Sequence, residues 1–114
     1  MIEIKGTAPK MIANNLEPFE PTHPGELLKD EIECRGVSQK QLAADMGVSY
    51  TVLNDILNCK RPVNTKFALL CEKATGIPAY MLLRLQADYD MIMTKRDKSF
   101  LKRLASVREI AAAL

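Results

Sequence analysis

Side chains that can hydrogen-bond to bases or pair with phosphates gather between residues 38 and 61. Hydroxyl, amide and carboxylate groups recur there three and four residues apart, a spacing that places them on one side of a helix. A helix presenting them could recognise double-stranded DNA, with base edges read by polar groups and phosphates held by Lys or Arg. The candidate DNA-binding residues are Gln39, Ser49, Tyr50, Thr51, Asn54, Asp55, Asn58, Lys60 and Arg61.

Four of these residues are expected to point outward from the second helix, and each has its own possible contact with DNA. Thr51 can donate or accept a hydrogen bond, and its methyl group can touch thymine. Asn54 can pair with adenine, and Asp55 can accept from the amino group of cytosine. Tyr50 can reach a base or a phosphate. These residue types therefore fit the reading of base edges.

The sequence indicates neither covalent catalysis nor metal binding. The chain has one histidine, His23, and three cysteines, Cys34, Cys59 and Cys71, without CxxC spacing. Neither a nucleophile with its base nor a carboxylate pair has a credible spacing. We therefore expect no enzyme activity, no metal and no cofactor. The odd number of cysteines fits a reducing cytoplasm.

The elements that must position the polar residues are two short helices. Ser38 is an N-cap with Gln41 three residues on as a capping box, Gly47 ends the first helix, and Ser49 caps the second. This composition is that of a helix-turn-helix, but an ordinary helix pair in an all-α core fits equally well. The expected buried residues are Leu42, Ala43, Met46, Leu53, Ile56 and Leu57.

The charge of this stretch adds weak support for DNA. Asn58, Lys60 and Arg61 follow the second helix, where a recognition helix would return the chain to the phosphate backbone. Residues 35–66 carry five Lys or Arg against two Asp. The stretch is mildly basic and is not a polybasic tract.

Three sequence motifs resemble a known family. SQKQLAADMGVS followed by ILNCKRP resembles the helix-turn-helix of the XRE-type phage-repressor superfamily. HPGELLKDEIECRG before it and LRLQADYD after it narrow the resemblance to the HigA-type, or VapI-like, antitoxins. The resemblance extends from His23 to about Met93, which is most of the chain.

This resemblance implies a phage-repressor-like domain that acts as a cytoplasmic homodimer on a palindromic operator. It also implies a protein partner, a RelE-like or HigB-like mRNA-cleaving toxin, which the antitoxin neutralises while repressing its own operon. Gln39 matches the family position that holds the DNA backbone. Similar proteins pair through their C-terminal region.

The chain departs from the family pattern in two respects. Similar sequences often have Arg where Tyr50 and Asp55 stand, so this helix has less positive charge. Asp55 would repel phosphate unless Arg61 or Lys60 pairs with it. The family's usual N-G-K turn reads N-C-K here, and left-handed backbone at Cys59 would cost ~1 kcal/mol.

The composition, 47% hydrophobic and 26% charged, is that of one globular domain, and no apolar run approaches the ~18 residues of a membrane helix. We expect an all-α fold of five to six helices. Residues 1–22 form a flexible N-terminal arm, residues 23–93 the helix-turn-helix domain with a dimerisation helix, and residues 94–114 a C-terminal amphipathic helix. The arm is either mostly disordered when free or orders on a partner.

Two further helices of the central domain have clear starts. Pro24 predicts the start of the first helix and Gly36 its end, with His23 as no more than an N-terminal neighbour. Asn64 or Thr65 caps a fourth helix. The apolar face expected for that fourth helix is Phe67, Ala68, Leu70, Cys71 and Ala74.

A fifth helix, opened by Pro78 and running through Met93, is apolar over more of its circumference than one small core requires. A dimer interface explains this, and deeper burial in the monomer is the alternative. After a polar break at residues 94–96, Asp97 caps the last helix, which packs on its own dimer or contacts DNA or toxin. The expected dimerisation residues are Met81, Leu82, Leu85, Tyr89 and Ile92.

Three functions remain open from the sequence. The first is a repressor that is also the antitoxin of a HigA-like system. The second is a stand-alone XRE-type regulator without a toxin. The third is a protein-interaction module that has lost DNA binding, which Asp55 makes conceivable. DNA binding follows from the residues and the resemblance together, whereas toxin binding follows from the resemblance alone.

Overall fold

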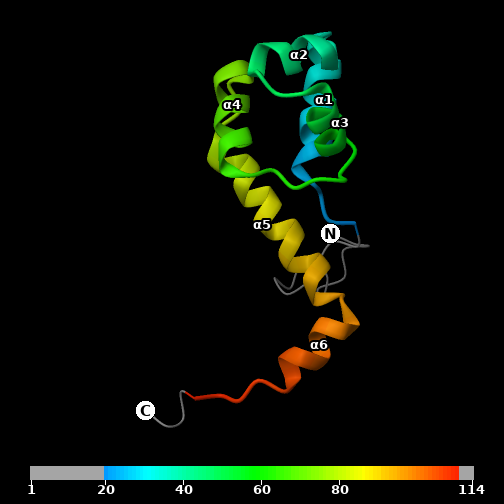
Figure 1. Ribbon diagram of the computed structural model, residues 1–114, viewed down its shortest axis with the longest axis vertical. Helices are drawn as coiled ribbons and strands as arrows, with labels where there is room; N and C mark the ends of the chain where they lie inside the picture. Colours follow the sequence, from blue (N-terminus) through cyan, green and yellow to red (C-terminus); the bar gives the residue numbers. More distant parts are fainter. Residues whose placement is uncertain (1–19, 111–114) are drawn as a thin grey trace, which may run out of the picture.

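The computed structural model describes residues 20–110 of the chain, and this range holds six helices and no strand. The predicted all-α fold of five to six helices is confirmed. The helices are α1 (Pro24–Arg35), α2 (Gln39–Met46), α3 (Tyr50–Leu57), α4 (Thr65–Thr75), α5 (Ala79–Lys95) and α6 (Lys98–Ala105). Helices α1–α4 form a packed group, α5 leads away from it, and α6 lies at the far end (Figure 1).

Local side chains fix where the middle helices begin. The Ser38 hydroxyl accepts a hydrogen bond from the backbone N–H of Gln41 at 3.0 Å, and the Ser49 hydroxyl does the same for α3. Asn64 caps α4. Gly47 ends α2 with φ of 72°, a left-handed conformation that favours glycine. The predicted two-helix unit with its short turn is therefore present.

The predicted capping box at the start of α2 is only half formed. Ser38 makes its cap bond, but the side chain of Gln41 donates to the carboxylate of Asp45 at 2.8 Å. Asp45 lies one turn along the helix, where an (i, i+4) partner is within easy reach of a Gln amide. Gln41 therefore stabilises α2 along its surface, and the backbone N–H of Ser38 is not its target.

The core lies between α1, α2, α3, α4 and the first half of α5. Helix α1 packs on α3, α2 packs on α3 and α4, and α4 packs on α5. Leu28, Leu53, Cys71 and Leu82 have no exposed surface. Burial raises the pKa of the Cys71 thiol, as expected for a cysteine that acts as a small core residue.

The start of α1 lies directly against the end of α3. A Cβ atom added at Gly25 would stand 1.8 Å from the carbonyl oxygen of Ile56. Only glycine permits this approach, because any side chain would meet backbone that cannot move away. The contact fixes the end of α3, and therefore its exposed face, relative to α1.

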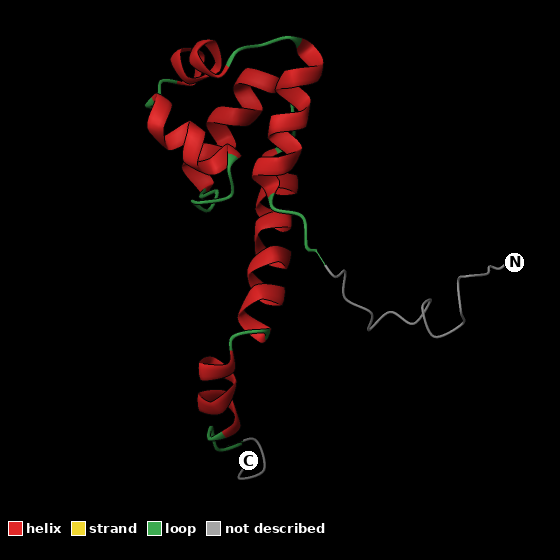
Figure 2. Cartoon of the chain, turned by 90° about the vertical axis from the view of Figure 1, so that its right-hand side faces the viewer, coloured by secondary structure: helices red, strands yellow, loops and turns green. Residues whose placement is uncertain are grey.

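Helix α5 begins in the core and leaves it. Its buried residues, Ala79, Leu82 and Gln86, all belong to its first half. The second half extends beyond the packed group toward α6 (Figure 2). No helix in residues 20–110 is both long enough and apolar enough to cross a membrane.

The apolar face predicted for α4 is partly wrong. Phe67, Ala68 and Cys71 are buried, but Leu70 is 41% exposed and Ala74 is exposed. On a helical wheel Leu70 and Ala74 lie on one flank of the stripe that the other three define. The core contacts α4 on the opposite flank, so these two residues face solvent.

The C-terminal boundaries also differ from the prediction. Helix α5 runs to Lys95, so the expected polar break begins two residues later. Helix α6 ends at Ala105, where the Ser106 hydroxyl donates to the carbonyl oxygen of Arg103 at 2.7 Å and so competes with further helix. The last four residues and most of the predicted N-terminal arm, residues 1–19, lie outside the described range.

Candidate nucleic-acid interface

Helix α3 turns its apolar side to the core and its polar side to solvent. Tyr50 is 50% exposed and Thr51 is exposed, whereas Asn54 and Asp55 are half-buried. Ser49, also a candidate contact, uses its hydroxyl to accept the N–H of Val52 at 3.1 Å. The most accessible polar groups of α3 are therefore those at its N-terminal end.

Three side-chain amides link the start of α2 to the end of α3. The Nδ2 of Asn54 donates to Oε1 of Gln39 at 2.9 Å. The Nδ2 of Asn58 donates to Oδ1 of Asn54 at 3.2 Å and to the backbone carbonyl of Asn54 at 2.9 Å. We call Gln39, Asn54 and Asn58 the amide chain. The sequence identified all three as candidates but gave no sign that they contact one another.

The carboxylate of Asp55 has a basic partner. Nη2 of Arg61 lies 3.2 Å from Oδ2 of Asp55, so one of the two basic residues that could offset this carboxylate does pair with it. The backbone N–H of Lys60, which is exposed, donates to the carbonyl oxygen of Asp55 at 2.8 Å. The ion pair is partly exposed and adds little stability, but it offsets negative charge on the polar side of α3.

The turn after α3 has the left-handed residue that its sequence predicts. Cys59 has φ of 63°, a region where a side chain is strained. Its Sγ lies 3.9 Å from a carboxylate oxygen of Glu26, to which the thiol can donate. Burial, reinforced by this carboxylate, raises the pKa of Cys59, so the thiol stays protonated.

An open hollow lies beside the start of α2. It is lined by Ser38, Gln39, Lys40 and Tyr50, and its volume is about 380 Å³. The first backbone N–H groups of a helix and its dipole favour anions. A phosphate placed here would meet polar groups of α2 and the first residue of α3 at once.

His23 has a larger structural role than its sequence position indicates. The residue is 2% exposed, and Nδ1 accepts the backbone N–H of Gly25 at 2.9 Å as the N-cap of α1. The Glu26 carboxylate completes the capping box by accepting the backbone N–H of His23 at 3.4 Å. The expectation that His23 is a mere neighbour of the helix is therefore wrong, because an imidazole nitrogen can cap a helix as a hydroxyl does.

The His23 ring also joins α1 to α5. It meets the Tyr89 ring edge-to-face, with centroids 4.9 Å apart and planes at 82°. Burial lowers the pKa of His23, although the carboxylates of Glu26 and Asp90 act in the opposite direction. A neutral ring is also what the cap requires, because Nδ1 must accept.

Gln86 is a second buried polar residue that the sequence did not single out. Its Oε1 accepts the backbone N–H of Val63 at 2.8 Å, and its Nε2 donates to Asp90 at 2.9 Å. The loop before α4 is thereby attached to α5. The available signal was spacing, since Gln86 lies four residues after Leu82 on the same face of α5.

The five predicted dimerisation residues differ in exposure. Leu82 is fully buried within the protomer, while Leu85, Tyr89 and Ile92 are half-buried and Met81 is 37% exposed. Leu82 therefore has no surface left for a partner. Other exposed apolar residues of α5 are Tyr80, Met91 and Met93.

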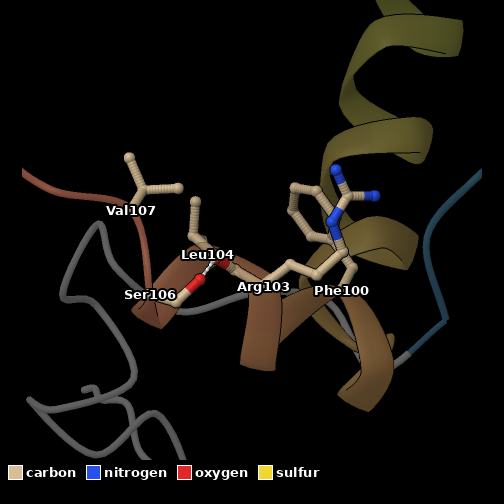
Figure 3. A pocket seen from close by; sticks show the side chains of 5 residues that line it. All are labelled: Phe100, Arg103, Leu104, Ser106 and Val107. Atoms are coloured by element: carbon tan, nitrogen blue, oxygen red, sulfur yellow. Dashed lines mark hydrogen bonds between the residues drawn. The ribbon is translucent and has the colours of Figure 1, made fainter.

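Helix α6 has no buried residue. Leu104 is 52% exposed and Val107 69%. These two and Phe100, Arg103 and Ser106 line an open hollow of about 270 Å³ (Figure 3). Helix α6 packs mainly on the end of α5. Helices α2 and α3, which carry most of the candidate DNA-binding residues, lie far from α6 (Figure 1).

No group of three or more His, Cys, Asp or Glu residues between 20 and 110 is arranged to hold a metal ion. The polar geometry that the structure does offer is the amide chain, the Asp55–Arg61 pair and the hollow at α2. All three surround α3.

Comparison with known proteins agrees with this geometry. The helix-turn-helix family model matches residues 28–82, from α1 into α5. Virulence-associated proteins A' and I of Dichelobacter nodosus are 35% and 34% identical over 62% and 67% of this chain. The chain spans 63% of the length of the first relative and 71% of the second.

Two solved structures are also similar. An addiction module antidote protein of a HigA family from Coxiella burnetii is 32% identical, with a TM-score of 0.69, over 80% of this chain and 99% of that one. PA4674 from Pseudomonas aeruginosa, in complex with its operator DNA, is 26% identical, with a TM-score of 0.66, over 72% of this chain and 91% of that one.

Proposed function

Since the chain belongs to the HigA-type family of XRE-like helix-turn-helix proteins, we propose that it is a DNA-binding repressor and the antitoxin of a toxin–antitoxin system. The observation that carries the DNA-binding part is the polar side of α3, held rigidly by the core and flanked by the hollow at α2. The family is one of non-enzymatic regulators. PA4674, which is similar in fold, was solved on its operator.

In this proposal α3 enters the major groove, which is wide enough for one helix. Tyr50 and Thr51 meet base edges because they lie at the exposed N-terminal end of α3. Lys60 lies beyond the helix and meets a phosphate. Gln39, at the start of α2, lines the hollow that receives a second phosphate.

The Asp55–Arg61 pair bears on the alternative that DNA binding has been lost. An unpaired Asp55 would repel phosphates close to α3. Because Arg61 stands 3.2 Å from it, the repulsion is offset within the protomer. The pair therefore favours a DNA-binding helix. The main role of Arg61 in this proposal is to pair with Asp55, and contact with a phosphate is secondary.

We propose that the repressor is a homodimer that pairs through α5 and binds a palindromic operator. The exposed residues Tyr80, Met81 and Met91 give α5 apolar surface outside the protomer core. Leu85→Glu should yield monomers, whereas Leu82→Glu should unfold the chain because Leu82 is buried in it. Sedimentation showing the unaltered protein to be monomeric at micromolar concentration would sink this part of the proposal.

The toxin partner is the part of the proposal that rests on the family alone. The similar Coxiella burnetii protein is described as an antidote of an addiction module. We propose that a HigB-like, mRNA-cleaving toxin is encoded beside this chain and forms a complex with it. Co-expression tests this: the chain should restore growth to cells expressing the neighbouring gene product, and a neighbour that is harmless alone would refute the idea.

Titration of two variants against DNA tests the binding mode. Thr51→Ala should cost ~1–3 kcal/mol on an operator duplex selected from a random pool, and little on scrambled DNA. Lys60→Ala should weaken binding to both duplexes alike and lower the salt slope of log K by roughly one for each phosphate that the variant no longer binds. In a two-fold dimer each substitution counts once per half-site.

The same titration can refute the proposal. Selection that enriches no sequence, together with unchanged affinity in both variants, would mean that α3 does not bind DNA. Equal losses for both variants on both duplexes would mean that α3 contacts the backbone without reading bases.

A further inference from the structure

The amide chain has a direction that one backbone atom determines. The Nδ2 of Asn58 lies 2.9 Å from the backbone carbonyl oxygen of Asn54. A carbonyl oxygen can only accept, so the atom of Asn58 facing it must be the NH2 group. The same NH2 lies 3.2 Å from the side chain of Asn54, which must therefore turn its oxygen toward Asn58.

This direction continues to the start of α2. With its oxygen facing Asn58, Asn54 turns its NH2 toward Gln39 and donates to Oε1 at 2.9 Å. The oxygen of Gln39 therefore points inward as the acceptor of this bond, and its NH2 group points outward. Reversing any one amide would set two donors or two acceptors against each other, which costs more than the bond is worth.

We propose that Asn58 and Asn54 are positioning residues that fix the side chain of Gln39 with its NH2 donors toward the DNA backbone. This inference rests on the proposed DNA-binding function. A phosphate oxygen accepts hydrogen bonds and offers no donor, so only the NH2 end of Gln39 is useful to it. Gln39 also lines the hollow with Ser38, Lys40 and Tyr50, where such a phosphate would lie.

The proposal changes the role expected for Asn54. The sequence indicates that Asn54 could pair with an adenine, a contact that takes both ends of the amide. In the structure one donor and one acceptor of that amide are already engaged, and the side chain is half-buried. Asn54 therefore acts through Gln39, and base reading is left to residues nearer the start of α3.

Asn58→Leu tests the proposal, because Leu is close in shape to Asn but cannot donate. Affinity for operator and for scrambled duplex should fall alike, by about fivefold per half-site, the value of one net hydrogen bond. In a Gln39→Ala background the same substitution should change affinity less than twofold. The free energy of unfolding should change equally in both backgrounds. If Asn58 had a purely structural role, its substitution would therefore lower DNA affinity by the same factor in both.

Two further measurements sharpen the test. Gln39→Glu keeps the oxygen that accepts from Asn54 but removes the outward donors, so DNA affinity should fall while unfolding is little changed. In ¹⁵N spectra the side-chain amide signals of Gln39 should shift in the Asn58→Leu variant. Unshifted signals would overturn the proposal. So would a loss of affinity for Asn58→Leu in the Gln39→Ala background that equals the loss in the unaltered background.

Asn54→Ala separates this inference from its alternative. A loss confined to the operator would mean that Asn54 reads a base, which overturns the inference and leaves the proposed function intact. An equal loss on both duplexes supports the inference. Failure of the unaltered protein to bind any duplex would instead refute the proposed function itself.

Discussion

Helices α3 and α6 have the same length and similar starts, but they differ in how much of their surface is buried. Each has eight residues, and each is capped by a side chain, Ser49 for α3 and Asp97 for α6. Both alternate apolar and polar residues at helical spacing. Yet α3 buries Leu53, Ile56 and Leu57, whereas α6 buries nothing.

The difference shows that local sequence can begin a helix without providing its stability. Full burial of an apolar side chain contributes about 1.5–3 kcal/mol, a contribution that α3 receives three times. An isolated helix of this length is marginal in water. Helix α3 is therefore rigid enough to present side chains for recognition, while α6 depends on its contact with α5.

The largest effect that tests this comparison comes from matched truncations. Leu53→Ala should cost about 2–5 kcal/mol, because it leaves a cavity at a residue with no exposed surface. Leu104→Ala in α6 should change the free energy of unfolding by about 0.5 kcal/mol or less, because Leu104 is 52% exposed. Urea denaturation measures both, and similar losses would show that α6 is packed more tightly than the structure indicates.

Acid should loosen the compact region and spare α6. The pKa of His23 is lowered below the ordinary 6.5, so the cap contributes fully above pH 6.5 and is lost as pH falls through the folded value. Protonation of the His23 ring removes the acceptor for the backbone N–H of Gly25 and disturbs the edge-to-face contact with Tyr89. The carboxylates of Glu26 and Asp90 offset the resulting loss of stability only in part.

Hydrogen exchange and denaturation between pH 7.5 and 5 measure this acid effect. Exchange in α1 should accelerate on acidification, beyond the intrinsic pH dependence, more than exchange in α6. His23→Asn keeps a capping oxygen without a titrating ring, so this variant should lose less stability over the same range. A variant with the same pH dependence as the unaltered chain would refute the role of His23.

The smallest effect concerns the turn after α3. Cys59→Gly should stabilise the fold by ~0.5–1 kcal/mol, because glycine adopts positive φ without strain. Gly47→Ala, in the turn before α3, should cost a similar amount, since open space surrounds the added methyl group and only the backbone is strained. A loss of stability in Cys59→Gly would mean that the thiol contact with Glu26 outweighs the strain.

Much of the α3 region was predictable because its signals are local. Caps at Ser38, Ser49 and Asn64, the glycine at Gly47 and the apolar spacing within each helix all act within one or two turns. The left-handed Cys59 followed from the pattern of its turn. Contacts between elements were not predictable in this way, because residues such as Gln39 and Asn54 are far apart in sequence.

By itself, the sequence determined the helices, their starts and the residues on the polar side of α3, because capping and periodicity are properties of neighbouring residues. Only the tertiary structure decided which of those residues touch. It joined Asn54 to Gln39 and turned His23 from a flanking residue into a buried cap against Tyr89. Such contacts depend on how α1, α2 and α5 pack around α3, which no short stretch of sequence encodes.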